Sequence, residues 1–141
     1  MGRTKTYDSK KINIAFGSHV VTGYAEGTFL NIERSGDGVT KKTGADGEIV
    51  RSLDPDTSAK LTVTVTQLSP TVGWAQQQYD KDNDTGDGTF PVLVKDMKGG
   101  LIFAAEDGWV VNPPNREFGR EAGEYEIEID TGPATWEGEA I

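Results

Sequence analysis

The sequence contains no cysteine, and only one of its 141 residues is a histidine. Without cysteine, the chain can form no disulfide framework and offers zinc no thiolate ligands. With a single imidazole, a transition-metal site would depend almost wholly on carboxylates, which favour hard ions. We therefore expect no metal and no cofactor.

Long apolar runs are also missing. No apolar stretch approaches the roughly 20 residues that cross a bilayer, and residues 1–11 are polar, unlike a secretory signal. We therefore expect no membrane anchoring, and synthesis in the cytoplasm of the producing cell.

Basic side chains are scarce in the second half of the chain. Residues 1–60 carry 9 Lys and Arg against 8 Asp and Glu, whereas residues 61–141 carry 5 against 15, which gives the net charge of -9. A protein that wraps nucleic acid needs clustered basic side chains, so this distribution argues against that class. It suits a subunit whose first half meets an acidic surface of the next copy. The alternative is that the acidic excess only keeps the protein soluble.

Glycine and proline are plentiful, at 18 and 6 residues, and they divide the chain into many short segments, as is typical of an all-β protein. The length predicts a single domain over residues 1–141. The clearest strands lie within 59–67 and at 124–130, where apolar and polar residues alternate strictly. The other predicted strands are 11–16, 28–34, 48–53, 90–96 and 101–105, with a short one at 109–111.

One helix is predicted after the strand at 59–67. Ser69 can cap it, Pro70 suits its first turn, and Val72, Ala75 and Tyr79 recur at helical spacing. We expect this helix to end in a loop over residues 80–88, and the residues 112–114 to turn the chain out of the sheet. The fold class is therefore mainly β, a β-sandwich or small barrel with one short α-helix.

Residues 35–47 form a polar, glycine-rich stretch between two predicted strands. The stretch has too few apolar residues to build a core, so we expect an extended loop that serves as an arm to another copy. Residues 1–10 predict a second arm, in which Arg3, Lys5 and Lys10 would dock on an acidic neighbour. The candidate residues of the first arm are Ser35, Gly36, Asp37, Gly38, Val39, Thr40, Lys41, Lys42 and Thr43.

Several sequence segments occur along the chain in the order typical of a family of phage structural proteins, and the chain resembles the tail-tube subunits of tailed bacteriophages. The segments are the Tyr7-Asp8 opening, GYAEGTFLNIER at 23–34, GADGEIVR at 44–51, LTVTVTQLSPTV from Leu61 and FPVLVKDMKG from Phe90. The resemblance implies a virion protein of the tail, whose copies form hexameric rings stacked into the tube that carries DNA out. It also implies sheath, baseplate and tail-terminator partners, and no specific binding of the DNA.

An acidic row follows from the alternation in 124–130. Tyr125, Ile127 and Ile129 should face the core. The opposite side of the strand then carries Glu124, Glu126, Glu128 and Asp130. In a DNA conduit such a row would repel phosphate from the lumen. On the outer wall it would dock a basic sheath, and in a plain soluble domain it would only favour solubility.

Other functions remain as alternatives. A ring protein of a contractile injection or secretion tube would share these features. A carbohydrate-binding β-sandwich would need an exposed platform among Trp74, Trp109 and Trp136, although large aromatics more often pack, with Trp74 holding the helix to the sheet and Trp109 in the core.

Catalysis and calcium binding have weaker support. Residues 80–86 alternate carboxylates, but an EF-hand needs glycine where Thr85 stands and glutamate where Pro91 stands, so a solvated loop is favoured. His19 could be a general base, but its neighbour Ser18 would point to the other face of a strand, so we expect a bystander in a turn. The many carboxylates leave glycosidase chemistry possible, yet no pair is identifiable from sequence. We expect no enzymatic activity.

Overall fold

An antiparallel eight-stranded sheet organises the chain in the computed structural model, which describes residues 7–97 and 100–137. Its strands follow the order β2-β1-β7-β8-β9-β6-β3, and β10 pairs with β8 beside this path. The members of the sheet are β1 (Ile12–Phe16), β2 (His19–Val20), β3 (Leu30–Arg34), β6 (Ala59–Thr66), β7 (Phe90–Asp96), β8 (Gly100–Asn112), β9 (Glu124–Thr131) and β10 (Ala134–Trp136).

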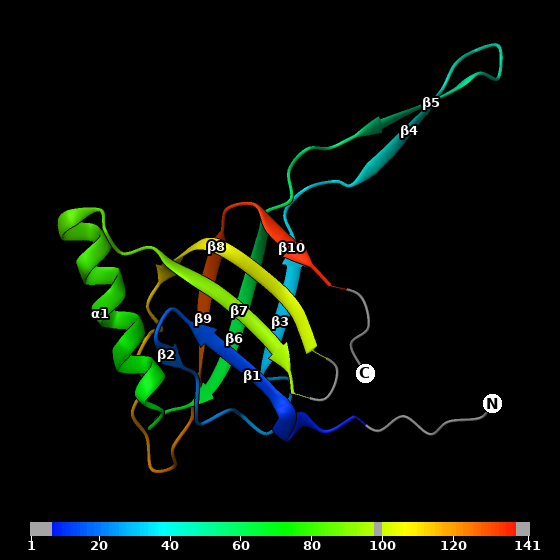
Figure 1. Cartoon of the computed structure of the whole chain (residues 1–141). Helices are drawn as coiled ribbons and strands as arrows, with labels where there is room; N and C mark the ends of the chain where they lie inside the picture. Colours follow the sequence, from blue (N-terminus) through cyan, green and yellow to red (C-terminus); the bar gives the residue numbers. More distant parts are fainter. Residues whose placement is uncertain (1–6, 98–99, 138–141) are drawn as a thin grey trace.

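The sheet folds over itself along β8 to make two layers. The first half of β8 pairs with β7 on one side and β10 on the other, whereas its second half pairs with β9. Figure 1 shows β1, β7 and the start of β8 crossing in front of β9, β6 and β3. Because β2 and β3 are both edge strands, the sheet does not close. The mainly β prediction is confirmed, and of its two forms the layered one is correct and the barrel is wrong.

The core lies between the layers and follows the alternation seen in the sequence. In β6, Leu61 and Val63 are fully buried, and they pair across the ladder with Ile129 and Ile127 of β9. From the other layer come Phe16 and the other apolar residues of β1, β7 and β8, namely Ile12, Ile14, Val92, Val94 and Phe103. Each such side chain contributes about 1.5–3 kcal/mol when it leaves water, so this core accounts for the stability of the two layers.

The helix α1 (Pro70–Thr85) begins as predicted and ends later than predicted. Ser69 accepts a hydrogen bond from the Thr71 backbone N–H, at 3.2 Å, and proline opens the first turn. The helix continues through the acidic segment, where Gln76 donates to Asp80 one turn on, and it stops at Gly86 in the left-handed conformation. The predicted loop over 80–88 is therefore wrong for its first six residues. The hydrogen bond between side chains one turn apart and the glycine cap at the end both stabilise the helix.

A hairpin outside the layers takes the place of part of the predicted loop and includes the strand predicted at 48–53. It consists of β4 (Val39–Thr43) and β5 (Ile49–Leu53), which form a separate two-stranded sheet and pair with no other strand of the described residues. Figure 1 shows it projecting from the end of the molecule where β10 lies. The tight turn between the strands has Gly47 at a φ of 84°, which glycine adopts without strain. Residues 39–43 were predicted as loop, but they meet the β-favouring Ile49 and Val50 in a local ladder.

Two further differences come from pairing between distant segments. The predicted strands 101–105 and 109–111 are one strand, β8, and Gly108 in its middle pairs with Phe90 and Thr131 at once. The short strands β2 and β10 were not predicted, since two or three residues give no periodic signal. The short 3-10 helix η1 (Ser9–Lys11) precedes β1 and is capped by Asp8.

Candidate assembly surfaces

The hairpin β4–β5 is exposed along its whole length. All ten residues of its strands are accessible to solvent, including Val39, Ile49, Val50 and Leu53, which expose 54–72% of their surface. Soluble monomers seldom expose a cluster of large apolar side chains without a use for it. The structure therefore gives the predicted arm a regular shape and an apolar surface.

The two faces of the hairpin differ in chemistry. Directly opposed residues share a face, and the cross-strand pairs of one face are Val39 with Leu53, Lys41 with Arg51, and Thr43 with Ile49. We call these six residues the hairpin face. Like charges directly opposite one another destabilise a ladder, and within residues 7–97 and 100–137 neither cation has an ion-pair partner. The hairpin face therefore combines apolar area with unneutralised positive charge.

Asp54 ties the base of the hairpin together. Its carboxylate accepts hydrogen bonds from the backbone N–H of Asp37 at 2.8 Å and of Asp56 at 2.9 Å, while its own N–H donates to the Gly38 carbonyl at 2.8 Å. The two bonds to the carboxylate, the one from Asp37 first, hold the pKa of Asp54 below its usual value. At neutral pH the Asp54 carboxylate is therefore ionised and can accept both hydrogen bonds.

The predicted acidic row lies on the outer face of the layer β9-β6-β3. Tyr125, Ile127 and Ile129 point into the core, as predicted, and the four carboxylates alternate with them. The residues that pair with the glutamates on β6 are threonines. Along the row, the structure records one ion pair in the described residues, from Lys60 to Glu128 at 3.8 Å.

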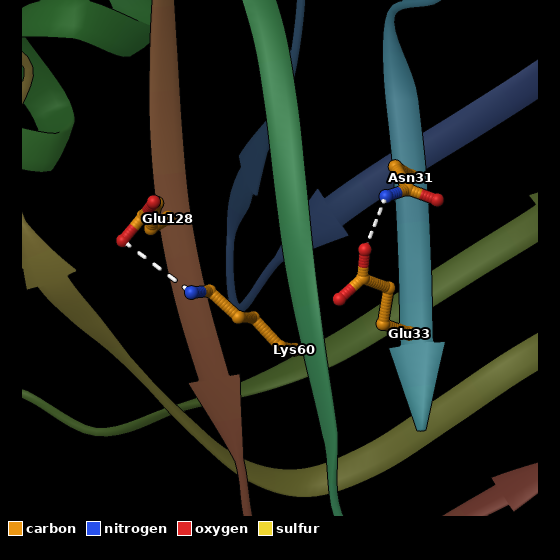
Figure 2. Close-up of polar contacts among 4 residues, drawn as sticks. All are labelled: Asn31, Glu33, Lys60 and Glu128. Carbon is orange, nitrogen blue, oxygen red and sulfur yellow. Dashed lines mark hydrogen bonds and ion pairs between the residues drawn. The ribbon is translucent and has the colours of Figure 1, made fainter. Parts of the chain in front are cut away.

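Figure 2 shows that outer face. Lys60 of β6 forms its ion pair with Glu128 of the neighbouring strand β9, and the Asn31 side chain of β3 donates a hydrogen bond to Glu33 at 3.0 Å. Next to the row, the segment after β8 and the helix enclose a hollow of about 700 Å³ lined by Tyr79, Glu117, Glu124 and Glu126 among others. The face is thus hydrophilic throughout, with carboxylates in excess.

The proposed N-terminal arm can be followed only in part. Lys10 lies exposed in η1, directly before β1. Arg3 and Lys5 lie outside the described residues. The docking of this segment on a neighbour stays a prediction.

The sequence suggested that His19 is a bystander in a turn, and this prediction is wrong. His19 opens β2, pairs with Phe16, and its ring stacks on Trp74 with centroids 4.9 Å apart. Its Nε2 lies 2.9 Å from the Thr71 hydroxyl, and burial lowers the pKa of the ring. These contacts give His19 a packing role between the sheet and the helix.

The tryptophans are all half-buried. Trp74 holds α1 to the sheet by stacking on Phe16, as predicted. Trp109 does not join the core cluster, contrary to prediction, but lies on β8 facing the helix near Tyr79. Trp136 packs edge-on against Phe103 and carries the guanidinium of Arg34 over its ring at 4.4 Å. None of the three forms the exposed platform that a sugar-binding module needs.

The segment that resembled a calcium loop is helical in the structure. The carboxylates of residues 80–85 lie on a helix rather than a loop, and among residues 7–97 and 100–137 no three His, Asp or Glu side chains gather as metal ligands do. In the same ranges no helix has the length and apolar character needed to span a bilayer.

Comparison with known proteins completes this picture. No family model matches the chain. Over 128 residues it is 27% identical to structural protein ORF10 of Pseudomonas phage KPP10. The aligned region covers 85% of this chain and 74% of that protein. The resemblance to phage structural proteins is confirmed.

The fold is shared with chains of three solved assemblies. The anti-feeding prophage cap, described as a tube-terminating cap, matches with a TM-score of 0.61 at 8% identity, covering 96% of this chain and 93% of the other. A chain from the virion of a native gene transfer agent gives 0.61 at 14% identity, covering 94% and 100%. The sheath/tube terminator of PVC, an extracellular contractile injection system, gives 0.61 at 8% identity, covering 97% and 100%. At these identities the likeness concerns the fold.

Proposed function

We propose that this chain is a structural subunit of a phage tail tube, whose copies assemble into hexameric rings stacked as the conduit for DNA ejection. The observation that carries the proposal is the projecting hairpin β4–β5, which exposes apolar side chains in a chain similar to a phage structural protein. Covering those side chains requires a partner, and a second copy of the chain is the partner always at hand.

The open edges of the sheet support the same proposal. β2 and β3 end the sheet, so no further strand of the described residues pairs with their outer sides. A ring in which neighbouring sheets continue one another would pair these edges and remove the aggregation hazard of a free edge. With six copies the formal charge is 6 × -9 = -54 per ring, so contacts between copies must outweigh a mean repulsion.

The proposed role is structural and not enzymatic. The relative from phage KPP10 is described as a structural protein, and the candidate surfaces above are docking surfaces. The protein would reside in the virion tail, with sheath, baseplate and terminator proteins as neighbours and with DNA passing through unbound. The acidic row would line the lumen or face the sheath.

A tube terminator is a second candidate function. Two of the structures with this fold are described as a tube-terminating cap and a sheath/tube terminator. A terminator differs from a tube subunit in one measurable property, because it forms a single ring and then stops. The tube of an injection or secretion system would polymerise as a phage tube does.

Negative-stain electron microscopy of the purified protein over a range of concentrations tests the proposal. We expect rings and stacked tubes, with sedimentation showing species far larger than the 15.2 kDa subunit. Single rings at all concentrations would indicate a terminator. A monomer at the highest soluble concentration, with binding to immobilised glycans, would contradict both structural functions.

A further inference from the structure

A groove of about 920 Å³ runs over the outer face of the layer formed by β1, β7 and the first half of β8. We call it the outer groove. Ala15, Leu93 and Ala104 contribute small and apolar side chains, and Leu93 is 39% exposed. Glu106 and Asp107 lie in the same lining, both are exposed, and neither makes an ion pair with another described residue.

The hairpin face complements this groove in two properties. Val39, Ile49 and Leu53 offer apolar area, and Lys41 with Arg51 offers two adjacent positive charges. The groove offers apolar surface beside two adjacent negative charges. Bringing the pairs together would relieve the repulsion between the two cations and between the two carboxylates, while water leaves the apolar surfaces.

We propose that the hairpin face of one copy docks into the outer groove of a second copy. In this contact Lys41 and Arg51 meet Glu106 and Asp107, and the apolar side chains cover Leu93. The inference rests on the proposed self-assembly and names the surface that receives the hairpin. A heterologous contact of this kind leaves each copy with one free hairpin and one free groove, so it propagates from copy to copy.

Two other hollows fit the hairpin face less well. The hollow beside the acidic row has apolar surface from Tyr79, Pro113, Pro114 and Tyr125, but it carries four carboxylates, so two of them would stay unpaired against the two cations of the hairpin face. These carboxylates are Glu117, Glu124, Glu126 and Glu128. A hollow of about 390 Å³ beside the core is lined mainly by apolar residues and by no charged one, so it would leave both cations desolvated and unpaired.

Disulfide trapping tests the contact directly, because the natural chain has no cysteine. We would mix two single-cysteine proteins before assembly, Ile49→Cys on the hairpin face and Leu93→Cys in the groove, and then oxidise. A disulfide between the two proteins joins two copies by necessity. We expect the mixed dimer as the main covalent product, and its loss when Val50→Cys, on the opposite face of the hairpin, replaces Ile49→Cys.

Charge reversal tests the same contact in the assembled state. Lys41→Glu with Arg51→Glu should raise the protein concentration needed for assembly by about tenfold or more, because like charges then meet across the interface. Glu106→Lys with Asp107→Lys should do the same, and the four changes together should restore assembly. Lys42→Glu, on the opposite face of the hairpin, is the matched control and should have little effect.

The outcomes separate this inference from the proposed function. Tubes or rings of the natural protein without the trapped pair, or trapping to Glu126→Cys in place of Leu93→Cys, would overturn the outer groove as the receptor and leave the structural role intact. Failure of the natural protein to assemble at any concentration would overturn the structural role and this inference with it.

Discussion

Trp74 is the residue on which the contact between helix and sheet depends. Its ring stacks on Phe16 at 5.2 Å, meets Phe90 edge-on at 5.0 Å and stacks on His19 at 4.9 Å. Aromatic pairs at these separations contribute beyond their buried area. One side chain therefore joins α1 to β1, β2 and β7.

Replacing Trp74 by alanine should destabilise the monomer by about 3 kcal/mol, since truncation of a large packed aromatic leaves a cavity. Urea unfolding followed by circular dichroism measures the loss. Trp109→Ala is the matched control, because Trp109 is half-buried outside the core cluster. An equal loss in both variants would mean that the aromatic stack has no special weight.

His19 should make stability depend on pH. Burial lowers the pKa of the ring below 6.5, so the unfolded chain binds the proton more readily than the folded one. Stability is therefore complete above pH about 6.5 and declines as the pH falls through that value, levelling off below the folded pKa. Urea midpoints between pH about 7.5 and about 5 measure this slope.

The control for this slope is His19→Gln, which can still hydrogen-bond Thr71 but does not titrate. We expect a smaller decline in the glutamine variant. An unchanged decline would assign the effect to other groups.

At the scale of elements, the sequence predicts what periodicity can carry. β6 and β9 alternate strictly, so their core faces and the acidic row could be assigned. The start of α1 could be predicted from Ser69, which caps it, and Pro70, its first residue. The continuity of β8 could not be predicted, because Glu106 and Asp107 interrupt its apolar pattern and only pairing with β7 and β9 keeps it extended.

The hairpin and its receptor illustrate the same limit. Polar composition located an arm at residues 35–47, but the pairing of Lys41 with Arg51 depends on a register that composition does not define. The outer groove unites residues of β1, β7, β8 and the segment before β10, which meet only in the folded sheet. No local sequence signal marks such a surface.

Shortening the hairpin should separate folding from assembly. The Gly38 carbonyl and the Asp54 N–H are 2.8 Å apart, so residues 39–53 can be replaced by an Asn-Gly turn without moving the ends. Because the hairpin residues are exposed and outside the core, we expect the stability of the monomer to change by less than about 1 kcal/mol. Assembly should be lost.

Sedimentation and electron microscopy of this shortened variant give the answer. Unfolding of the variant would contradict the independence of the hairpin from the core. Tubes from the variant would contradict its role as an arm.

At the scale of the whole molecule, the two outer faces differ. The layer β1-β7-β8 presents the outer groove, whereas the layer β9-β6-β3 presents threonines and carboxylates with the single cross-strand ion pair seen among the described residues there. A surface of the second kind forms few apolar contacts and repels phosphate. In the proposed tube, such a surface would suit the wall of the DNA conduit, or alternatively an outer wall that docks a basic sheath.

Replacing Glu124, Glu126 and Glu128 by lysine tests this assignment. The monomer should stay folded, since these side chains point away from the core, and thermal unfolding checks that. In particles carrying the variant, a row facing the lumen should retain DNA and slow its ejection at low salt, with relief at high salt. Normal ejection with failed sheath assembly would place the row on the outer wall, and no change would leave solubility as its role.

The long strand β8 has a mechanical consequence. Because one half of it belongs to each layer, the two layers are joined by a continuous backbone as well as by side-chain packing (Figure 1). In the proposed assembly, a load applied to one layer through a neighbouring copy would pass along this strand into the other layer. To slide the layers apart, such a load would have to shear the hydrogen-bond ladders that β8 forms in both layers at the same time.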